Sequence, residues 1–103
     1  MCILFNQRRC RIQWSRHRRS RRRAILLIEA QSPGALVAVA TLDRPDLALA
    51  PDEVAIAEFG PAAGALSALV EAGVISPPLR VIEDDDQPIL ICRLQVDAVN
   101  GVD

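Results

Sequence analysis

Lysine is absent from the 103 residues of this sequence, and aromatic side chains make up only 3% of it. Every positive charge is therefore an arginine guanidinium, which stays ionised at any working pH and can form forked hydrogen bonds to phosphate or carboxylate. Phe59 is the only aromatic residue after Trp14. This scarcity argues against an aromatic-lined ligand pocket or a base-stacking platform in the main part of the chain.

From Ala24 onward the chain also lacks histidine. Serine and threonine hydroxyls in this part have no general base nearby, and Cys92 has no histidine to deprotonate it. The apolar neighbours of Cys92 predict a small buried side chain instead. Gly60 and Gly64 enclose Pro-Ala-Ala with no lysine or serine directly after them, so a glycine-rich phosphate loop is missing too. We therefore expect no catalytic residues, no cofactor and no enzymatic activity.

The three cysteines are an odd number and do not form the framework of a disulfide-rich protein, which favours a reducing compartment. No run approaches the roughly 18 to 20 apolar residues that span a bilayer. The apolar start of the chain precedes the first arginines, which reverses the order found in secretory signals. An organellar targeting peptide over residues 1–28 is an alternative, although adjacent arginines leave no clean apolar face. We expect a cytoplasmic protein that does not enter a membrane.

Acidic residues are absent from residues 1–23, which hold nine of the 12 arginines. Residues 24–103 hold all 13 acidic residues, so a segment of charge +9 precedes one of charge −10. The first segment also contains no Ala, Gly, Val, Pro or Thr. Blocks of like charge are usually disordered. The sequence therefore predicts a disordered arginine-rich extension over residues 1–23 and a single small domain over residues 24–103.

Apolar runs separated by turn residues predict the secondary structure of that domain. Pro61 suits the start of a helix and Gly73 its end, and Leu66 and Leu69 fall on one face between them. The predicted order is ββ-β-α-ββ, with strands over residues 24–30, 35–42, 54–59, 79–83 and 88–96, a helix over 61–72 and an irregular loop over 43–53. This order predicts an α+β fold in which one helix packs on one face of a small, mainly antiparallel sheet.

Three stretches carry a resemblance to a known group of domains: RPDLALAPDEVAIAEFG, ALSALVEAGVI and PILICRLQ. Over about residues 35–95, the chain resembles a family of small uncharacterised domains from bacterial and phage hypothetical proteins. That family has a polar Glu-Asn-Glu-Gly turn ahead of the helix, where this chain has PAAG at residues 61–64. The resemblance implies the fold and the extent of the domain, and it implies no activity.

One group of side chains has the chemistry of a metal site. Cys2, Cys10 and His17 are of the metal-binding type, but the gaps of seven and six residues between them match no standard zinc spacing. A fourth ligand is missing as well. We expect no metal.

Two groups of carboxylates have alternative interpretations. Asp52, Glu53 and Glu58 form an acid–base pair only if one of them is buried, and the sequence favours a solvated loop. Residues 83–86 read EDDD, but calcium loops place carboxylates at alternate positions around a glycine. A solvated turn between two strands is the simpler interpretation.

The arginine-rich segment is the best candidate for a binding function. Such segments contact the phosphates of RNA and single strands, and an aromatic side chain adds a stacking surface. They bind polyanions with little sequence preference. The candidate nucleic-acid-binding residues are Arg8, Arg9, Arg11, Trp14, Arg16, Arg18, Arg19, Arg21, Arg22 and Arg23.

Three hypotheses about function follow. The first is a non-catalytic domain that binds a protein partner of unknown identity, with a homodimer possible because sheet edges need covering. The second is a nucleic-acid-binding accessory protein that uses the arginine-rich segment for non-specific RNA or DNA binding. The third is that residues 1–23 are a non-native translated extension without function, since a GC-rich gene read in a wrong frame yields Arg, Ser, Cys, Trp and His.

Overall fold

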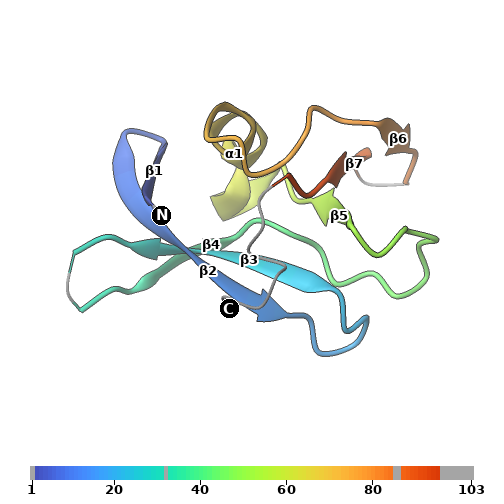
Figure 1. Ribbon diagram of the computed structural model, residues 1–103, viewed down its shortest axis with the longest axis horizontal. Coiled ribbons are helices and arrows are strands. Elements are labelled where there is room, and N and C mark those ends of the chain that lie inside the picture. Colours follow the sequence, from blue (N-terminus) through green and yellow to red (C-terminus); the bar gives the residue numbers. More distant parts are fainter. Residues whose placement is uncertain (1, 32, 85–86, 96–103) are drawn as a thin grey trace.

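The computed structural model describes residues 2–31, 33–84 and 87–95, which form a small α+β fold with antiparallel sheets and one α-helix (Figure 1). The four-stranded sheet has the order β1-β2-β3-β4, and the three-stranded sheet has the order β5-β7-β6. The strands are β1 (Cys2–Phe5), β2 (Arg8–Arg16), β3 (Arg23–Glu29), β4 (Leu36–Val39), β5 (Glu53–Ile56), β6 (Arg80–Ile82) and β7 (Ile89–Arg93). The helical elements are a 3-10 turn, η1 (Gly60–Ala62), and the helix α1 (Ala65–Glu71).

The predicted fold class is confirmed, and its details are confirmed in part. From residue 23 onward the order β3-β4-β5-α1-β6-β7 follows the predicted order ββ-β-α-ββ. Two further strands precede it, and the strands are divided between two sheets instead of one. The predicted boundary at Ala24 falls inside β3, which pairs along its length with β2. The predicted end of the last strand at residue 96 lies outside the described residues.

The prediction that the arginine-rich segment is disordered is wrong, because residues 2–16 form β1 and β2. In β2, the inward positions are taken by Cys10, Ile12 and Trp14, and exposed polar residues alternate with them. This period of two is the pattern of a strand with one buried face. The arginines of β2 therefore remain in solvent while the strand pairs on both sides.

A tight turn connects β1 and β2. Phe5 pairs with Arg8, and the two residues between them, Asn6 and Gln7, have φ angles of 50° and 66°. Two consecutive left-handed residues are typical of a type I′ turn, whose twist matches that of the flanking strands and in which asparagine is favoured. The side-chain amide of Asn6 also donates a hydrogen bond to the carbonyl of Ala63, at 2.9 Å. This bond ties the first hairpin to the segment that leads into α1.

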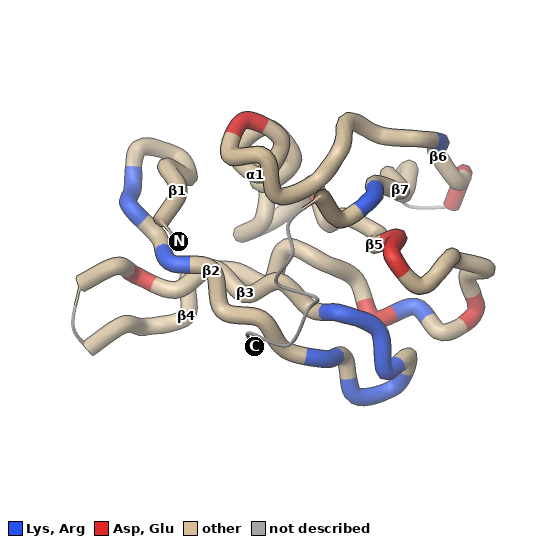
Figure 2. Tube along the Cα trace, viewed as in Figure 1, with Lys and Arg blue, Asp and Glu red and all other residues tan. Residues whose placement is uncertain are grey.

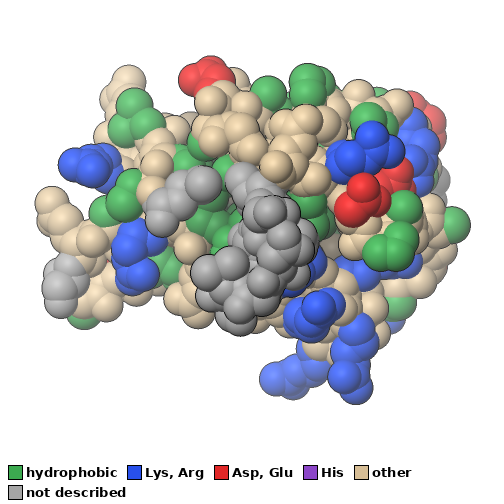
Figure 3. Space-filling view, in the orientation of Figure 1, with side chains coloured by type: hydrophobic (Ala, Val, Ile, Leu, Met, Phe, Trp, Pro, Cys, Tyr) green, Lys and Arg blue, Asp and Glu red, His purple; other side chains and the backbone are tan. Residues whose placement is uncertain are grey.

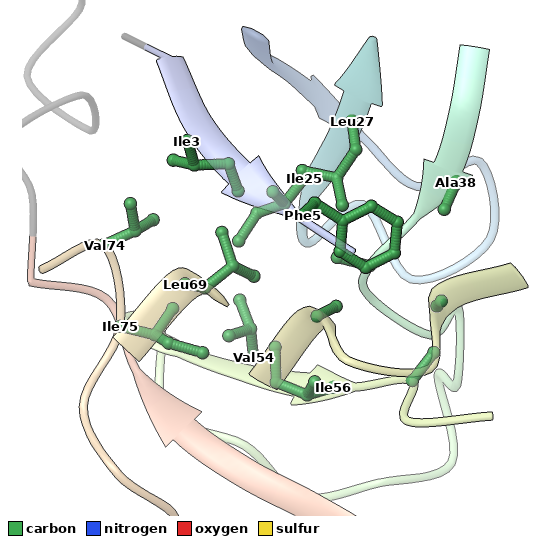
Figure 4. Close-up of a cluster of buried hydrophobic side chains, with 14 of the residues drawn as sticks. Ile3, Phe5, Ile25, Leu27, Ala38, Val54, Ile56, Leu69, Val74 and Ile75 are labelled. Carbon is green, nitrogen blue, oxygen red and sulfur yellow. The ribbon is translucent and has the colours of Figure 1, made fainter. Parts of the chain in front are cut away.

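The main hydrophobic core lies between the two sheets and α1 (Figure 4). Ile3 and Phe5 point from β1 into the same cluster as Ile25 and Leu69 (Figure 4). A smaller cluster lies on the other face of the three-stranded sheet, where the predicted irregular loop covers it with Leu47. Residues 1–23, which the sequence predicts to be a charged extension, therefore contribute side chains to the main core.

Residues 40–42 connect the two sheets. The amide of Ala40 donates to the carbonyl of Ile25 in β3, at 2.9 Å. The carbonyl of Ala40 accepts from the amide of Ala57, at 2.8 Å, and Thr41 forms a bridge with Ile56 of β5. This short segment therefore pairs with strands of both sheets. The two sheets and α1 together enclose the core (Figure 1).

Within the described part of the chain, no helix is long and apolar enough to cross a membrane, since α1 has only 7 residues.

Candidate nucleic-acid interface

Strand β2 and the turn after it display a row of exposed guanidinium groups. The alternation of β2 places Arg9, Arg11, Gln13 and Ser15 on the face that points away from the core. A strand of nine residues is about 30 Å long. Figure 2 shows arginine positions in blue at both ends of β2. We call the exposed arginines of β2 and the following turn the arginine strip: Arg8, Arg9, Arg11, Arg16, Arg18, Arg19 and Arg21.

The turn between β2 and β3 is held by hydrogen bonds from within the turn. The amide of His17 donates to the carbonyl of Arg22, at 2.9 Å, and the amide of Arg21 donates to the carbonyl of His17, at 3.1 Å. The guanidinium of Arg16 donates to the carbonyl of Arg21, at 2.9 Å. These bonds close the turn even though Arg21 has a left-handed φ of 63°.

Asp43, from the loop after β4, holds the same turn from outside. Its two carboxylate oxygens accept hydrogen bonds from the amides of Arg19, at 3.0 Å, and Ser20, at 2.8 Å. Hydrogen bonds to a charged acceptor are stronger than those between neutral groups. The backbone that carries Arg18, Arg19 and Arg21 is therefore held in one conformation.

His17 is half-buried beside this turn. Its Nε2 atom lies 2.7 Å from the hydroxyl oxygen of Thr41, which also accepts a hydrogen bond from the amide of Ile25 at 3.2 Å. Burial lowers the pKa of His17 from its ordinary value of 6.5, and the nearby carboxylate of Asp43 partly opposes that change. His17 therefore favours the neutral form and connects the turn to the segment that joins the sheets.

Three of the predicted nucleic-acid-binding residues are partly buried. The guanidinium of Arg22 donates to the carbonyls of Arg44, at 2.9 Å, and Leu47, so it holds the loop that covers the smaller hydrophobic cluster. Trp14 is partly buried and packs against the main core. Arg23 begins β3 and is partly buried. The remaining seven predicted arginines are the exposed ones of the arginine strip.

The predicted metal-type residues do not meet. Cys2 and Cys10 lie on paired strands β1 and β2, with Cys2 exposed and Cys10 buried. His17 lies beyond the other end of β2, against Thr41. Over residues 2–31, 33–84 and 87–95, no three His, Cys, Asp or Glu side chains are grouped closely enough to hold a metal ion.

Glu53 is not in a solvated loop, contrary to the expectation from sequence. It is 8% exposed, and its carboxylate accepts a forked pair of hydrogen bonds from Arg80, at 2.9 and 3.0 Å. The amide of Ala50 donates to it as well, at 3.0 Å. These hydrogen bonds, those from Arg80 first, lower the pKa of Glu53 from 4.5 to about 2. The carboxylate therefore joins β5 to β6.

The other two predicted carboxylates have separate structural roles. Glu58 accepts hydrogen bonds from the amides of Gly64, at 2.7 Å, and Leu66, at 2.8 Å, which are unpaired donors at the start of α1. Asp52 is exposed and lies 3.2 Å from the guanidinium of Arg93. The three carboxylates therefore do not form an acid–base pair.

Cys92 lies in the main core, as predicted from its apolar neighbours. Burial raises the pKa of its thiol from 9.0 to about 11. A thiol with this pKa is protonated at neutral pH, so it is a poor nucleophile. In the acidic stretch, Glu83 and Asp84 are exposed, and residues 85 and 86 lie outside the described residues.

The outer face of the four-stranded sheet combines these charges with exposed aliphatic side chains. Leu4 of β1 is 65% exposed and pairs with Arg9, so both lie on this face. Leu36 of β4 is 57% exposed and is on the same face as Arg11, because both are in register with Ile28 of β3. The arginine strip is therefore bordered by apolar surface.

A shallow hollow of about 600 Å³ lies at one end of the strip. Its lining includes the guanidinium-bearing residues Arg8 and Arg9 and the acidic residue Glu29. The carboxylate at this end limits the attraction that the hollow has for an anion.

No protein-family model matches the chain, and no curated protein or solved structure matches it significantly. The resemblance to small bacterial and phage domains stays a prediction.

Proposed function

We propose that this protein acts by binding and that the arginine strip binds the phosphate backbone of a nucleic acid. The observation that carries the proposal is the placement of seven exposed guanidinium groups on one strand and the turn that follows it. A guanidinium forms forked hydrogen bonds with phosphate oxygens and releases counterions from the nucleic acid on binding. Because β2 and its turn are held by pairing and hydrogen bonds, little backbone conformational freedom is lost on binding.

The acidic residues of the chain reduce this attraction less than their number suggests. Glu53 is paired with Arg80, and Asp46 accepts a forked pair of hydrogen bonds from Arg44, at 2.9 and 2.8 Å. Asp43 accepts two backbone amides of the turn. These carboxylates already accept hydrogen bonds from Arg80, from Arg44 and from backbone amides. A phosphate can therefore bind a guanidinium of the strip without first displacing one of these three carboxylates.

Fluorescence anisotropy with a labelled oligonucleotide tests the proposal. We expect the Arg9→Gln/Arg11→Gln variant to bind more weakly at low salt. The slope of log affinity against log salt should fall by about 1 for each lost phosphate contact. Arg93→Gln is the matched control, because Arg93 is an exposed arginine of the other sheet. Affinity that does not change with salt, or equal losses in the double variant and the control, would contradict the proposal.

The exposed aliphatic side chains on the outer face favour a second candidate function, which is binding of a protein with an acidic surface. Leu4 and Leu36 lie beside arginines, and arginine with apolar neighbours is typical of protein interfaces. Leu36→Gln keeps every charge of the strip. It should weaken binding to such a partner and leave nucleic-acid affinity unchanged. Sedimentation of the protein alone tests the homodimer, which should dissociate in the same variant.

Residues 1–23 are proposed to be a genuine part of the protein rather than a translated extension. Burial of Ile3, Phe5 and Cys10 in the core supports this interpretation, as does the type I′ turn between β1 and β2. Intact mass spectrometry of protein from its natural host should give the mass of the whole chain, and a mass lacking these residues would contradict the proposal. The three free cysteines are consistent with a cytoplasmic location.

A further inference from the structure

We infer that the preferred ligand is B-form duplex DNA and that the turn over residues 17–22 enters its major groove. This inference rests on the proposed function, since it names the nucleic acid that the arginine strip binds. Strands β2 and β3 form an antiparallel ribbon in which Cys10 pairs with Glu29 at one end and Arg16 with Arg23 at the other. The turn 17–22 is the tip of that ribbon.

The tip of the ribbon carries a concentration of exposed arginines. Arg18, Arg19 and Arg21 are exposed in this turn, and Arg16 is exposed directly before it. Figure 1 shows the turn on the side of the molecule away from α1, and Figure 3 shows arginine side chains projecting there. A projecting tip can enter a groove, whereas a flat basic face can contact only the edge of a duplex.

Groove dimensions distinguish between the possible nucleic acids. The major groove of B-DNA is about 12 Å wide and admits a two-stranded β-ribbon. Near the tip, the segment after β4 lies against the β3 side of the ribbon through Ala40 and Asp43, so the part that can enter a groove is the turn 17–22 with its side chains. In A-form RNA the major groove is deep and narrow, so side chains cannot reach into it. A projecting turn that carries arginines therefore favours duplex DNA over duplex RNA.

The position of the aromatic residues argues against single strands. Proteins that bind single strands stack the bases on exposed aromatic side chains. Trp14 is on the inward side of β2, against the core, and Phe59 lies beyond β5, outside the four-stranded sheet. The arginine strip itself contains no aromatic residue. Without an exposed aromatic side chain on the strip, contact relies mainly on phosphates and groove edges, which a duplex presents in a regular array.

The fixed conformation of the tip supports the same conclusion. Asp43 binds the amides of Arg19 and Ser20, and Arg16 binds the carbonyl of Arg21. The guanidinium groups of the turn are thus carried on a preformed backbone, which lowers the ordering cost of insertion into a rigid groove. The charge of Asp43 repels phosphate, but the arginines around the turn outnumber it.

The test compares three labelled ligands of one sequence, all at one salt concentration: duplex DNA, single-stranded DNA and duplex RNA. We expect the full chain to bind duplex DNA at least about tenfold more tightly than the other two. The Arg18→Gln/Arg19→Gln/Arg21→Gln variant should lose that preference. Arg9→Gln/Arg11→Gln is the matched control, and it should weaken binding to all three ligands by a similar factor while the preference remains.

The possible results separate the inference from the proposed function. Equal or tighter binding to single-stranded DNA or duplex RNA would overturn the inference, while salt-dependent affinity for these ligands would still support the proposed function. Loss of the preference in the control variant, but not in the turn variant, would also overturn it. Absence of salt-dependent binding to all three ligands would overturn both. Since the substituted arginines are exposed, circular dichroism should show the folded state in each variant.

Discussion

Substitution of Phe5 by alanine tests whether the basic N-terminal segment belongs to the core. Phe5 is 2% exposed and packs in the main hydrophobic cluster, whereas its neighbour Leu4 is 65% exposed. Truncation of a buried phenylalanine costs about 3 to 5 kcal/mol. A domain has about 5 to 15 kcal/mol of stability in total, so Phe5→Ala should remove a large part of it. Leu4→Ala should change the free energy of unfolding by no more than about 0.5 kcal/mol.

Urea unfolding followed by circular dichroism measures both variants against the natural chain. We expect the midpoint to fall strongly for Phe5→Ala and to stay nearly constant for Leu4→Ala, with similar slopes. Equal, small effects in both variants would show that Phe5 is not part of the core, because a disordered segment has no buried side chain to lose. A chain that begins at Ala24 gives the converse test. It lacks both strands on one side of β3, so we expect it not to unfold cooperatively, and a cooperative transition would support the boundary predicted from composition.

Three further predictions concern the rest of the fold. Leu69→Ala should cost about 2 to 5 kcal/mol in urea unfolding, because Leu69 is fully buried in α1, and a loss below about 0.5 kcal/mol would contradict its role in the core. Gly64→Ala should destabilise more than Gly73→Ala. Both glycines have a positive φ, but a Cβ at Gly64 would lie 2.5 Å from the side-chain oxygen of Asn6, while none of the surrounding atoms is within 4 Å at Gly73. Equal losses of stability would show that the contact with Asn6 is unimportant. Glu53 has a pKa of about 2 in the folded state against an ordinary 4.5, so its contribution to stability is complete above pH 4.5 and is lost as the pH falls to about 2. The stability difference between the natural chain and Glu53→Gln, measured by urea unfolding at several pH values, should shrink over that range, and a constant difference would contradict the pairing.

Much of the fold follows from local patterns that the sequence displays directly. The runs that became β3 and β4 are apolar and are separated by a proline and a glycine, and the helix ends before Gly73 as expected. It begins at Ala65 and not at Pro61 as predicted, because residues 60–62 form the 3-10 turn η1. These signals are local, because turn residues restrict the backbone and helical spacing needs only neighbouring positions. The buried position of Cys92 was predictable for the same reason, since its neighbours along the chain are apolar.

The hairpin of β1 and β2 was not predicted, because the charge of residues 1–23 was given more weight than the alternation of apolar and polar residues within them. Residues 1–23 have the charge of a disordered segment, yet Cys10, Ile12 and Trp14 alternate with polar residues and Asn6 stands at a favoured turn position. That alternation is visible in the sequence. An alternating pattern leads to a strand only when another strand is available to pair with it. Here that strand is β3.

The α+β class, the end of the helix before Gly73 and the concentrated row of arginines all follow from the sequence alone. Which of these arginines face solvent depends on how the chain folds in three dimensions. The tertiary structure turns Trp14 toward the core and uses Arg22 to hold the loop near Leu47. It also brings Arg80 to Glu53, 27 residues away, and so removes that carboxylate from solvent. The physical reason is that burial and pairing depend on which segments meet across the core, and the distance along the chain carries no information about that.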